Sequence, residues 1–228
     1  AGAWSDTKAV PAAGGITYDI ELIGQAASFT PNTVDGAVQT WADSANSNDA
    51  AQATPSARPT FREEGALDYL EFDGIDDRLE IPADASWRGT DMSMIMVARL
   101  TDITSSRVLA GGLDGGYVVL VENNDTSTAV GRGANYYADG VLVGTSGTVT
   151  RDDVYTAYAT GDWVIIEAAG VDFTQEDFNS GLQFPGWRGT LNLPNNMDVG
   201  EVLILPTPDA DANRATIVSA LKTKYGIV

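Results

Sequence analysis

The segment from Trp41 to Leu79 decides the fold class. It opens with WADSANSNDAAQATPSARPTF (41–61), a polar stretch of small residues around Asn and Asp, and continues after a short acidic link with LDYLEFDGIDDRLEI (67–81). Apolar and polar residues alternate in the first part of this second stretch, which predicts a β-strand with one buried face. Asp73-Gly74 then predicts a turn before a second short apolar run. The segment therefore predicts β-strands joined by an Asp-rich turn.

Further strands are expected along the chain. Residues 92–100 (MSMIMVARL) are apolar with little alternation. That pattern fits a central strand covered on both faces, and the Gly-rich flanks favour a strand over a buried helix. The remaining strands are expected at 16–23, 34–41, 107–110, 117–122, 135–138, 141–143, 154–159, 163–168 and 197–205.

The period changes near the C-terminus. Ile217, Val218, Leu221 and Tyr225 recur three to four residues apart, which predicts one amphipathic helix within 209–225. Aspartates at its start and lysines in its last turn suit the helix dipole.

Three passages resemble the laminin-G-like, concanavalin A-like family. They are the 41–79 segment, the Asp139-Gly140 hairpin within 135–144, and the strand, linker and helix that run from 197 to 226. The resemblance implies an all-β fold, a two-sheet antiparallel jelly-roll sandwich with one C-terminal α-helix. We expect this single domain to span 16–228. Residues 1–15, which are small, polar and punctuated by Pro and Gly, are expected to form an extended arm.

Composition excludes several functions. The chain has 13 basic and 32 acidic residues and a net charge of −19, which argues against nucleic-acid partners and anionic membranes. It contains no His and no Cys. Their absence excludes Ser-His-Asp and Cys-His mechanisms and disfavours transition metals. We see no signal peptide in the first ten residues and no apolar run that approaches a membrane span.

One carboxylate pattern is typical of catalysis. Glu71, Asp73 and Asp76 stand at the spacing of the E-x-D-x-x-E motif of laminarinase-type glycosidases, which share the jelly-roll fold. Retaining glycosidases need two carboxylates about 5 Å apart. Here Asp replaces the last Glu, and Gly74 is expected to break the strand. We therefore expect no enzymatic activity.

Calcium is the one expected candidate cofactor. Ca²⁺ takes six to eight oxygen ligands, and the resemblance implies that two Asp-rich loops fold close together. The alternative is that these aspartates form turns. The candidate ligands are Asp43, Asp49, Asp73, Asp76 and Asp77.

Glycan or protein contacts are expected at aromatic and arginine side chains. The sequence W-R-G-T occurs at 87–90 and again at 187–190. Such Trp-Arg pairs suit a glycan platform, a protein interface or internal packing. Trp41 and Trp163, in apolar strands, are expected in the core. The candidate contact residues are Trp87, Arg88, Trp187, Arg188, Tyr136 and Tyr137.

The expected function is that of a non-catalytic virion protein. The arm, with Trp4 as its anchor in a neighbouring subunit, favours a capsid-surface or tail-associated component of a tailed phage that serves in structure or attachment. Its expected partners are other virion subunits or its own copies, with a host-surface glycan as a candidate ligand, and its expected location is the virion surface. The alternative is an extracellular glycan-binding module or laminarinase-like glycosidase of a marine bacterium.

Overall fold

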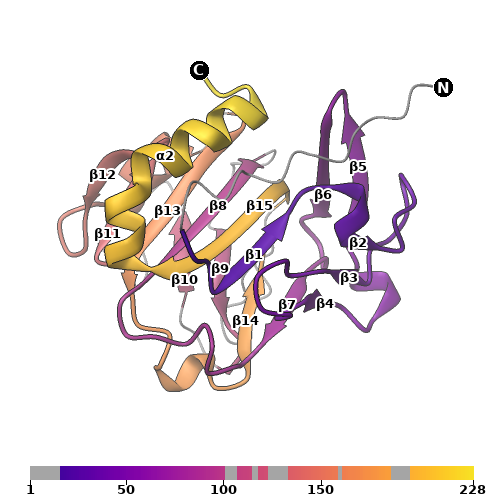
Figure 1. Cartoon of the computed structure of the whole chain (residues 1–228), viewed down its shortest axis with the longest axis horizontal. Coiled ribbons are helices and arrows are strands. Elements are labelled where there is room, and N and C mark those ends of the chain that lie inside the picture. Colours follow the sequence, from indigo (N-terminus) through magenta and orange to yellow (C-terminus); the bar gives the residue numbers. More distant parts are fainter. Residues whose placement is uncertain (1–15, 101–106, 115–117, 123–132, 159–160, 186–195) are drawn as a thin grey trace.

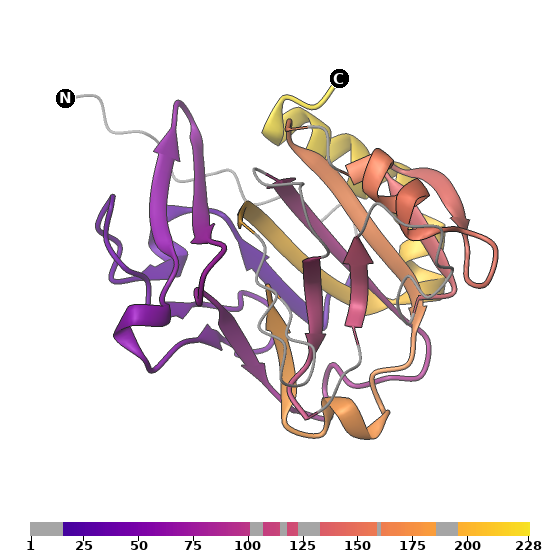
Figure 2. The same cartoon turned by 180° about the vertical axis from the view of Figure 1, so that it is seen from behind.

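Two antiparallel β-sheets form the body of the protein (Figures 1 and 2). The computed structural model describes residues 16–100, 107–114, 118–122, 133–158, 161–185 and 196–228. Residues 1–15, which were expected to form an arm with Trp4, lie outside the described residues, as do Trp187 and Arg188.

The first sheet runs in the order β12-β11-β13-β8-β15-β6-β5, and β1 pairs with β15 beside this path. Its strands are β1 (Ile20–Ile23), β5 (Thr60–Glu64), β6 (Leu67–Asp73), β8 (Met92–Leu100), β11 (Asn135–Ala138), β12 (Val141–Thr145), β13 (Val164–Val171) and β15 (Asn196–Pro206).

The second sheet runs in the order β10-β9-β14-β7-β4-β3-β2. Its strands are β2 (Phe29–Thr30), β3 (Thr40–Trp41), β4 (Ala50–Ala51), β7 (Leu79–Pro82), β9 (Arg107–Gly112), β10 (Val118–Glu122) and β14 (Gly181–Phe184). Three short 3₁₀ helices are also described: Ala26–Ser28, Pro55–Ala57 and Glu176–Phe178.

The main core lies between the two sheets. Residues of alternating strand positions, such as Leu70 and Phe72 of β6, are fully buried there together with Trp41. The prediction for β8 is confirmed, because this strand lies between β13 and β15 and buries nearly all its side chains.

A helix covers the outer face of the first sheet (Figure 1). Helix α2 (Thr207–Tyr225) buries Ile217, Val218 and Leu221 against a second apolar cluster that includes Ile95 and Leu203. It begins two residues before the expected range, and Gly226 ends it in a left-handed conformation. The expected fold class, a two-sheet antiparallel β-sandwich with a C-terminal helix, is confirmed.

Two local predictions are wrong. Residues 154–159 were expected to form a strand, but α1 (Arg151–Tyr158) is a helix. Thr150 and Asp153 cap its start reciprocally, since each backbone N–H donates to the other side chain, at 2.8 and 3.1 Å. Of the strand expected at 34–41, only the last two residues form a strand, β3. No helix among the described residues is long and apolar enough to cross a membrane.

Candidate functional site

The turn after β6 gathers three of the expected calcium ligands. Carboxylate oxygens of Asp73, Asp76 and Asp77 lie within 4.8 Å of one another. Asp73 Oδ1 accepts the backbone N–H of Ile75 at 2.8 Å, and Asp77 Oδ2 accepts that of Asp73 at 3.1 Å. The aspartates therefore form the turn as well as bring negative charges together.

Asp77 is the buried member of this trio. Burial raises the pKa of Asp77 to about 7, while the N–H bond from Asp73 opposes the rise and the neighbouring carboxylates of Asp73 and Asp76 add to it. Near neutral pH, the Asp77 carboxyl is therefore about equally populated in its protonated and ionised forms.

The other two expected calcium ligands do not join the trio within the described residues. The carboxylate of Asp43 accepts four backbone N–H bonds, from Glu21, Ala45, Asn46 and Asn48, at 2.8–3.0 Å. Asp49 Oδ1 accepts the N–H of Asp43 at 2.9 Å. Both side chains are occupied in folding their own loop, so the expected two-loop site is not formed.

The laminarinase-like pattern is not assembled on one strand. β6 ends at Asp73, Gly74 has a φ of 72°, and Asp76 lies in the following turn. Glu71 pairs with Arg62 of the neighbouring strand β5. The expected strand break is confirmed, and Asp76 is separated from the strand that carries Glu71.

Two of the expected contact residues are internal. Trp87 is fully buried, donates from Nε1 to the carbonyl of Pro82 at 3.1 Å, and packs edge-on against Phe173. Tyr136 is also fully buried. Neither ring offers a face to a glycan. The prediction of glycan contact is therefore corrected for both residues, whose side chains take part in internal packing. Tyr137 is half-buried, and the centroid of its ring lies 3.8 Å from the guanidinium carbon of Arg214.

Arg88 is half-buried, and it lines a depression of about 420 Å³. It donates to the carbonyls of Phe173 and Thr174 and to the side-chain oxygen of Asn179.

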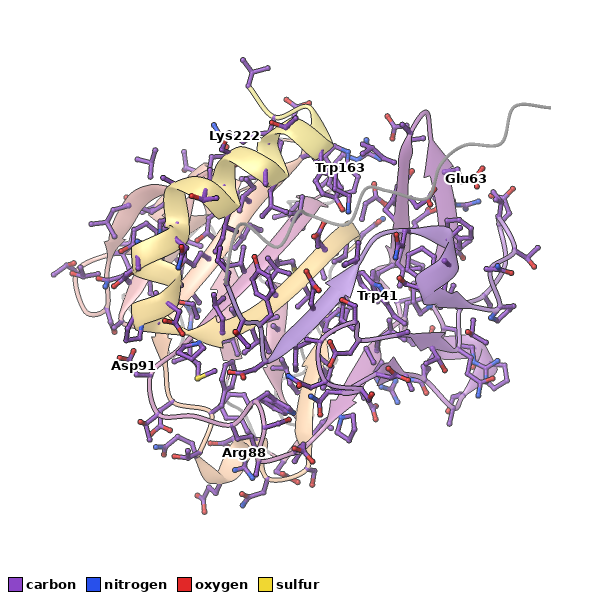
Figure 3. The ribbon with its side chains drawn as sticks, in the orientation of Figure 1. Trp41, Glu63, Arg88, Asp91, Trp163 and Lys222 are labelled. Carbon is purple, nitrogen blue, oxygen red and sulfur yellow. The ribbon has the colours of Figure 1, made fainter. Side chains whose placement is uncertain are left out.

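A second cavity of about 420 Å³ was not predicted. It lies beneath the end of α2, where Figure 3 shows Trp163. Trp163, expected in the core, is half-buried and forms part of the wall. The lining residues are Asp139, Asp162, Trp163, Val164, Tyr225, Gly226, Ile227 and Val228.

The indole of Trp163 is held from several sides. Its ring centroid lies 5.4 Å from that of Tyr69 and 5.3 Å from that of Tyr225. The guanidinium carbon of Arg99 lies 4.9 Å from the same ring. Arg99 is itself paired with Asp198 at 2.7 Å, so the ring is fixed by the strands of the first sheet and by α2.

Sequence reasoning missed this cavity because α2 and β13 form it together. The local signal was a Trp that follows Thr160-Gly161-Asp162 at the start of a strand. That context indicates a strand edge, and only the docked helix turns it into a cavity wall.

Comparisons with known proteins assign no family. No family model matches the chain, and no curated protein matches it. The solved structures that match include Trypanosoma rangeli sialidase in complex with sialic acid, at 12% identity and a TM-score of 0.47, over 90% of this chain and 32% of that one. The covalent intermediate of the same sialidase with 2,3-difluorosialic acid matches at 15% identity and 0.47, over 94% and 34%.

The chain thus spans about a third of the sialidase chains that it matches. Similarity at this level assigns neither a family nor an activity to this protein. The matched proteins are nevertheless enzymes, which contradicts our expectation of a protein without enzymatic activity, and that expectation is withdrawn.

Proposed function

We propose that the chain is a glycan-binding domain and that the cavity beside Trp163 is its sugar site. The observation that carries the proposal is a partly exposed, firmly held indole in the wall of a 420 Å³ cavity that two carboxylates also line. That volume falls within the range of about 300–1,000 Å³ that is usual for small-ligand sites.

The lining fits the two faces of a sugar ring. The C–H face of a hexose packs on an aromatic ring, as an apolar group does, and its hydroxyls donate to carboxylate oxygens. Trp163 supplies the ring, and Asp139 and Asp162 supply the carboxylates. Because the contacts with Tyr69, Tyr225 and Arg99 already fix the indole, binding orders few additional groups.

The charge of the site favours an uncharged sugar. The wall contains two Asp side chains, Asp139 and Asp162, and no Lys or Arg, and the whole chain has a net charge of −19. An anionic saccharide would be repelled here, whereas a neutral hexose would not.

The wider role rests on the sequence. Membership of the laminin-G-like family and a jelly-roll topology are proposals supported by the three passages described above. A structural or attachment role on a virion surface, with virion subunits or own copies as partners, likewise remains a prediction. Glycan binding is compatible with attachment to a host surface and with the alternative of an extracellular glycan-binding module.

The test is a binding screen of the full chain against neutral oligosaccharides. Titration of a hit is followed by tryptophan fluorescence and calorimetry in the unsubstituted protein, Trp163→Ala and Asp162→Asn. Loss of the stacking face should weaken binding at least about 2-fold and up to about 10-fold, because an aromatic contact contributes about 0.5–1.5 kcal/mol beyond area burial. Trp163→Phe, which keeps an aromatic face, should retain most of the affinity.

The control is Asp84→Asn, which removes an exposed carboxylate at the other cavity and should leave neutral-sugar binding unchanged. The proposal is refuted if no neutral glycan binds, or if a folded Trp163→Ala variant binds as tightly as the unsubstituted chain.

A further inference from the structure

The depression around Arg88 has a different chemistry from the Trp163 cavity. It lies at the opposite end of the molecule, as the labels in Figure 3 show. It is lined by the loop after β7 and by residues between β13 and β14. The lining residues are Ala83, Asp84, Ala85, Arg88, Thr174 and Asn179.

Arg88 is firmly positioned, but no carboxylate of the described residues pairs with it. Its Nε donates to the carbonyl of Phe173 at 3.0 Å, and its Nη2 donates to Asn179 Oδ1 at 2.9 Å and more weakly to the carbonyl of Thr174 at 3.4 Å. All three acceptors are neutral. Within the described part of the chain, Nη1 donates to no protein atom, so the guanidinium keeps two N–H groups for a ligand.

Four other arginines of the described structure differ from Arg88 in this respect. Arg62, Arg78, Arg99 and Arg214 each pair with at least one carboxylate. In a chain of net charge −19, a fixed guanidinium without such a partner is a local positive charge, and its geometry suits a carboxylate.

The other polar groups of the depression suit hydroxyls. Asp84 is exposed, and its bond from the backbone N–H of Ser86 lowers the pKa of this carboxyl, so it is ionised at neutral pH and accepts hydroxyl protons. The side-chain oxygen of Asn179 accepts a hydrogen bond from Arg88, so the side-chain NH₂ group of Asn179 remains a donor for a ligand. Arg88 balances the one charge of a carboxylate, whereas a doubly charged phosphate would bring a second, uncompensated negative charge beside Asp84.

We propose that this depression binds the uronic acid residue of an acidic saccharide. The sugar carboxylate would pair with Arg88, and its ring hydroxyls would bond to Asp84 and Asn179. The volume of about 420 Å³ suits a ligand of that size. This site is independent of the proposed neutral-sugar site beside Trp163.

The first experiment uses the unsubstituted full chain and ¹⁵N-resolved NMR spectra during titration with D-glucuronate, D-glucose and acetate. Glucuronate should shift the amide signals of residues 83–88 and 174–179, with a Kd on the order of 1 mM. Glucose should leave those signals unmoved, and acetate should move them more weakly. Glucuronate shifts confined to residues 162–164 and 225–228, or no shifts at all, would overturn the proposal.

The second experiment compares Arg88→Gln with Arg58→Gln. Arg58 is a matched control, because it too is held by backbone carbonyls, those of Gln52 and Ala53, and has no carboxylate partner among the described residues. Arg88→Gln should weaken glucuronate binding about 10-fold or more, and Arg58→Gln should not change it. Equal binding by the two variants would refute the role of Arg88. Because glucose titration reports on the Trp163 site, either proposal can fail alone.

Discussion

Replacement of Asp77 by Asn should stabilise the protein at high pH and leave its stability nearly unchanged at low pH. Asp77 is buried in the turn after β6, beside the carboxylates of Asp73 and Asp76. Asn has almost the same shape, and its side-chain oxygen can still accept the backbone N–H of Asp73. The substitution therefore removes a buried titratable group while it keeps the turn.

The magnitude follows from the pKa. Burial raises the pKa of Asp77 from 3.8 to about 7, so the folded state holds a proton that the unfolded state has released. Stability consequently falls as pH rises from about 4 to about 7 and is not changed further by this group at higher pH. A shift of about three pKa units corresponds to about 4 kcal/mol as an upper limit. Because the turn can relax toward water, we expect a gain of about 1–3 kcal/mol for Asp77→Asn.

The assay is urea unfolding followed by tryptophan fluorescence, at about pH 4 and about pH 8. Asp76→Asn is the control, since it removes the same charge from a half-exposed position of the same turn. Its effect should be below about 0.5 kcal/mol at either pH. The reasoning is refuted if Asp77→Asn gains as much at the lower pH as at the higher, or if it gains no more than Asp76→Asn.

Two further predictions concern charges in and near the first sheet. Calcium should raise the melting temperature of the unsubstituted chain relative to a chelator, and this rise should be lost in Asp77→Asn, because an ion that binds only the folded state stabilises it; equal melting temperatures would remove the site. Lys224→Met should cost about 3–5 kcal/mol, because it leaves the fully buried carboxylate of Glu201 without the ammonium group that lies 2.8 Å away. The double variant Lys224→Met/Glu201→Gln should recover most of that loss in the free energy of unfolding. A double variant no more stable than Lys224→Met would contradict the explanation.

The elements that could be predicted are those whose signal is local. The apolar side chains of residues 92–100 are removed from water only by burial, and these residues form the central strand β8. Asp139-Gly140 lies between two strands and takes positive φ angles of 51° and 82°, as a tight hairpin requires. The spacing of Ile217, Val218 and Leu221 placed the buried face of α2. In each case neighbouring residues determine the conformation.

Helix α1 shows how a local signal can be misread. Its β-branched and aromatic residues favoured a strand, but Val154 and Tyr158 are four residues apart and both are buried in the core. The Thr150-x-x-Asp153 cap was present in the sequence and indicated a helix start. Here capping and helical spacing outweighed residue propensity.

The site residues could not be predicted in the same way, because exposure depends on distant segments. Trp87 and Trp163 each follow a polar turn in the sequence, yet the first is packed on Phe173 and the second forms part of a cavity wall. Nothing within a few residues of either Trp distinguishes them. The difference arises from what covers each ring, which is a property of the whole sandwich.

The two cavities therefore depend on the fold in different ways. The Trp163 cavity is bounded by β13 and by the end of α2, including Tyr225 and Gly226, so it exists only while α2 is docked. That docking depends in part on the buried pair of Lys224 and Glu201 next to Tyr225. A change that loosens the pair should alter the neutral-sugar site as well as stability. The Arg88 depression is formed without α2, and the same change should leave its chemistry intact.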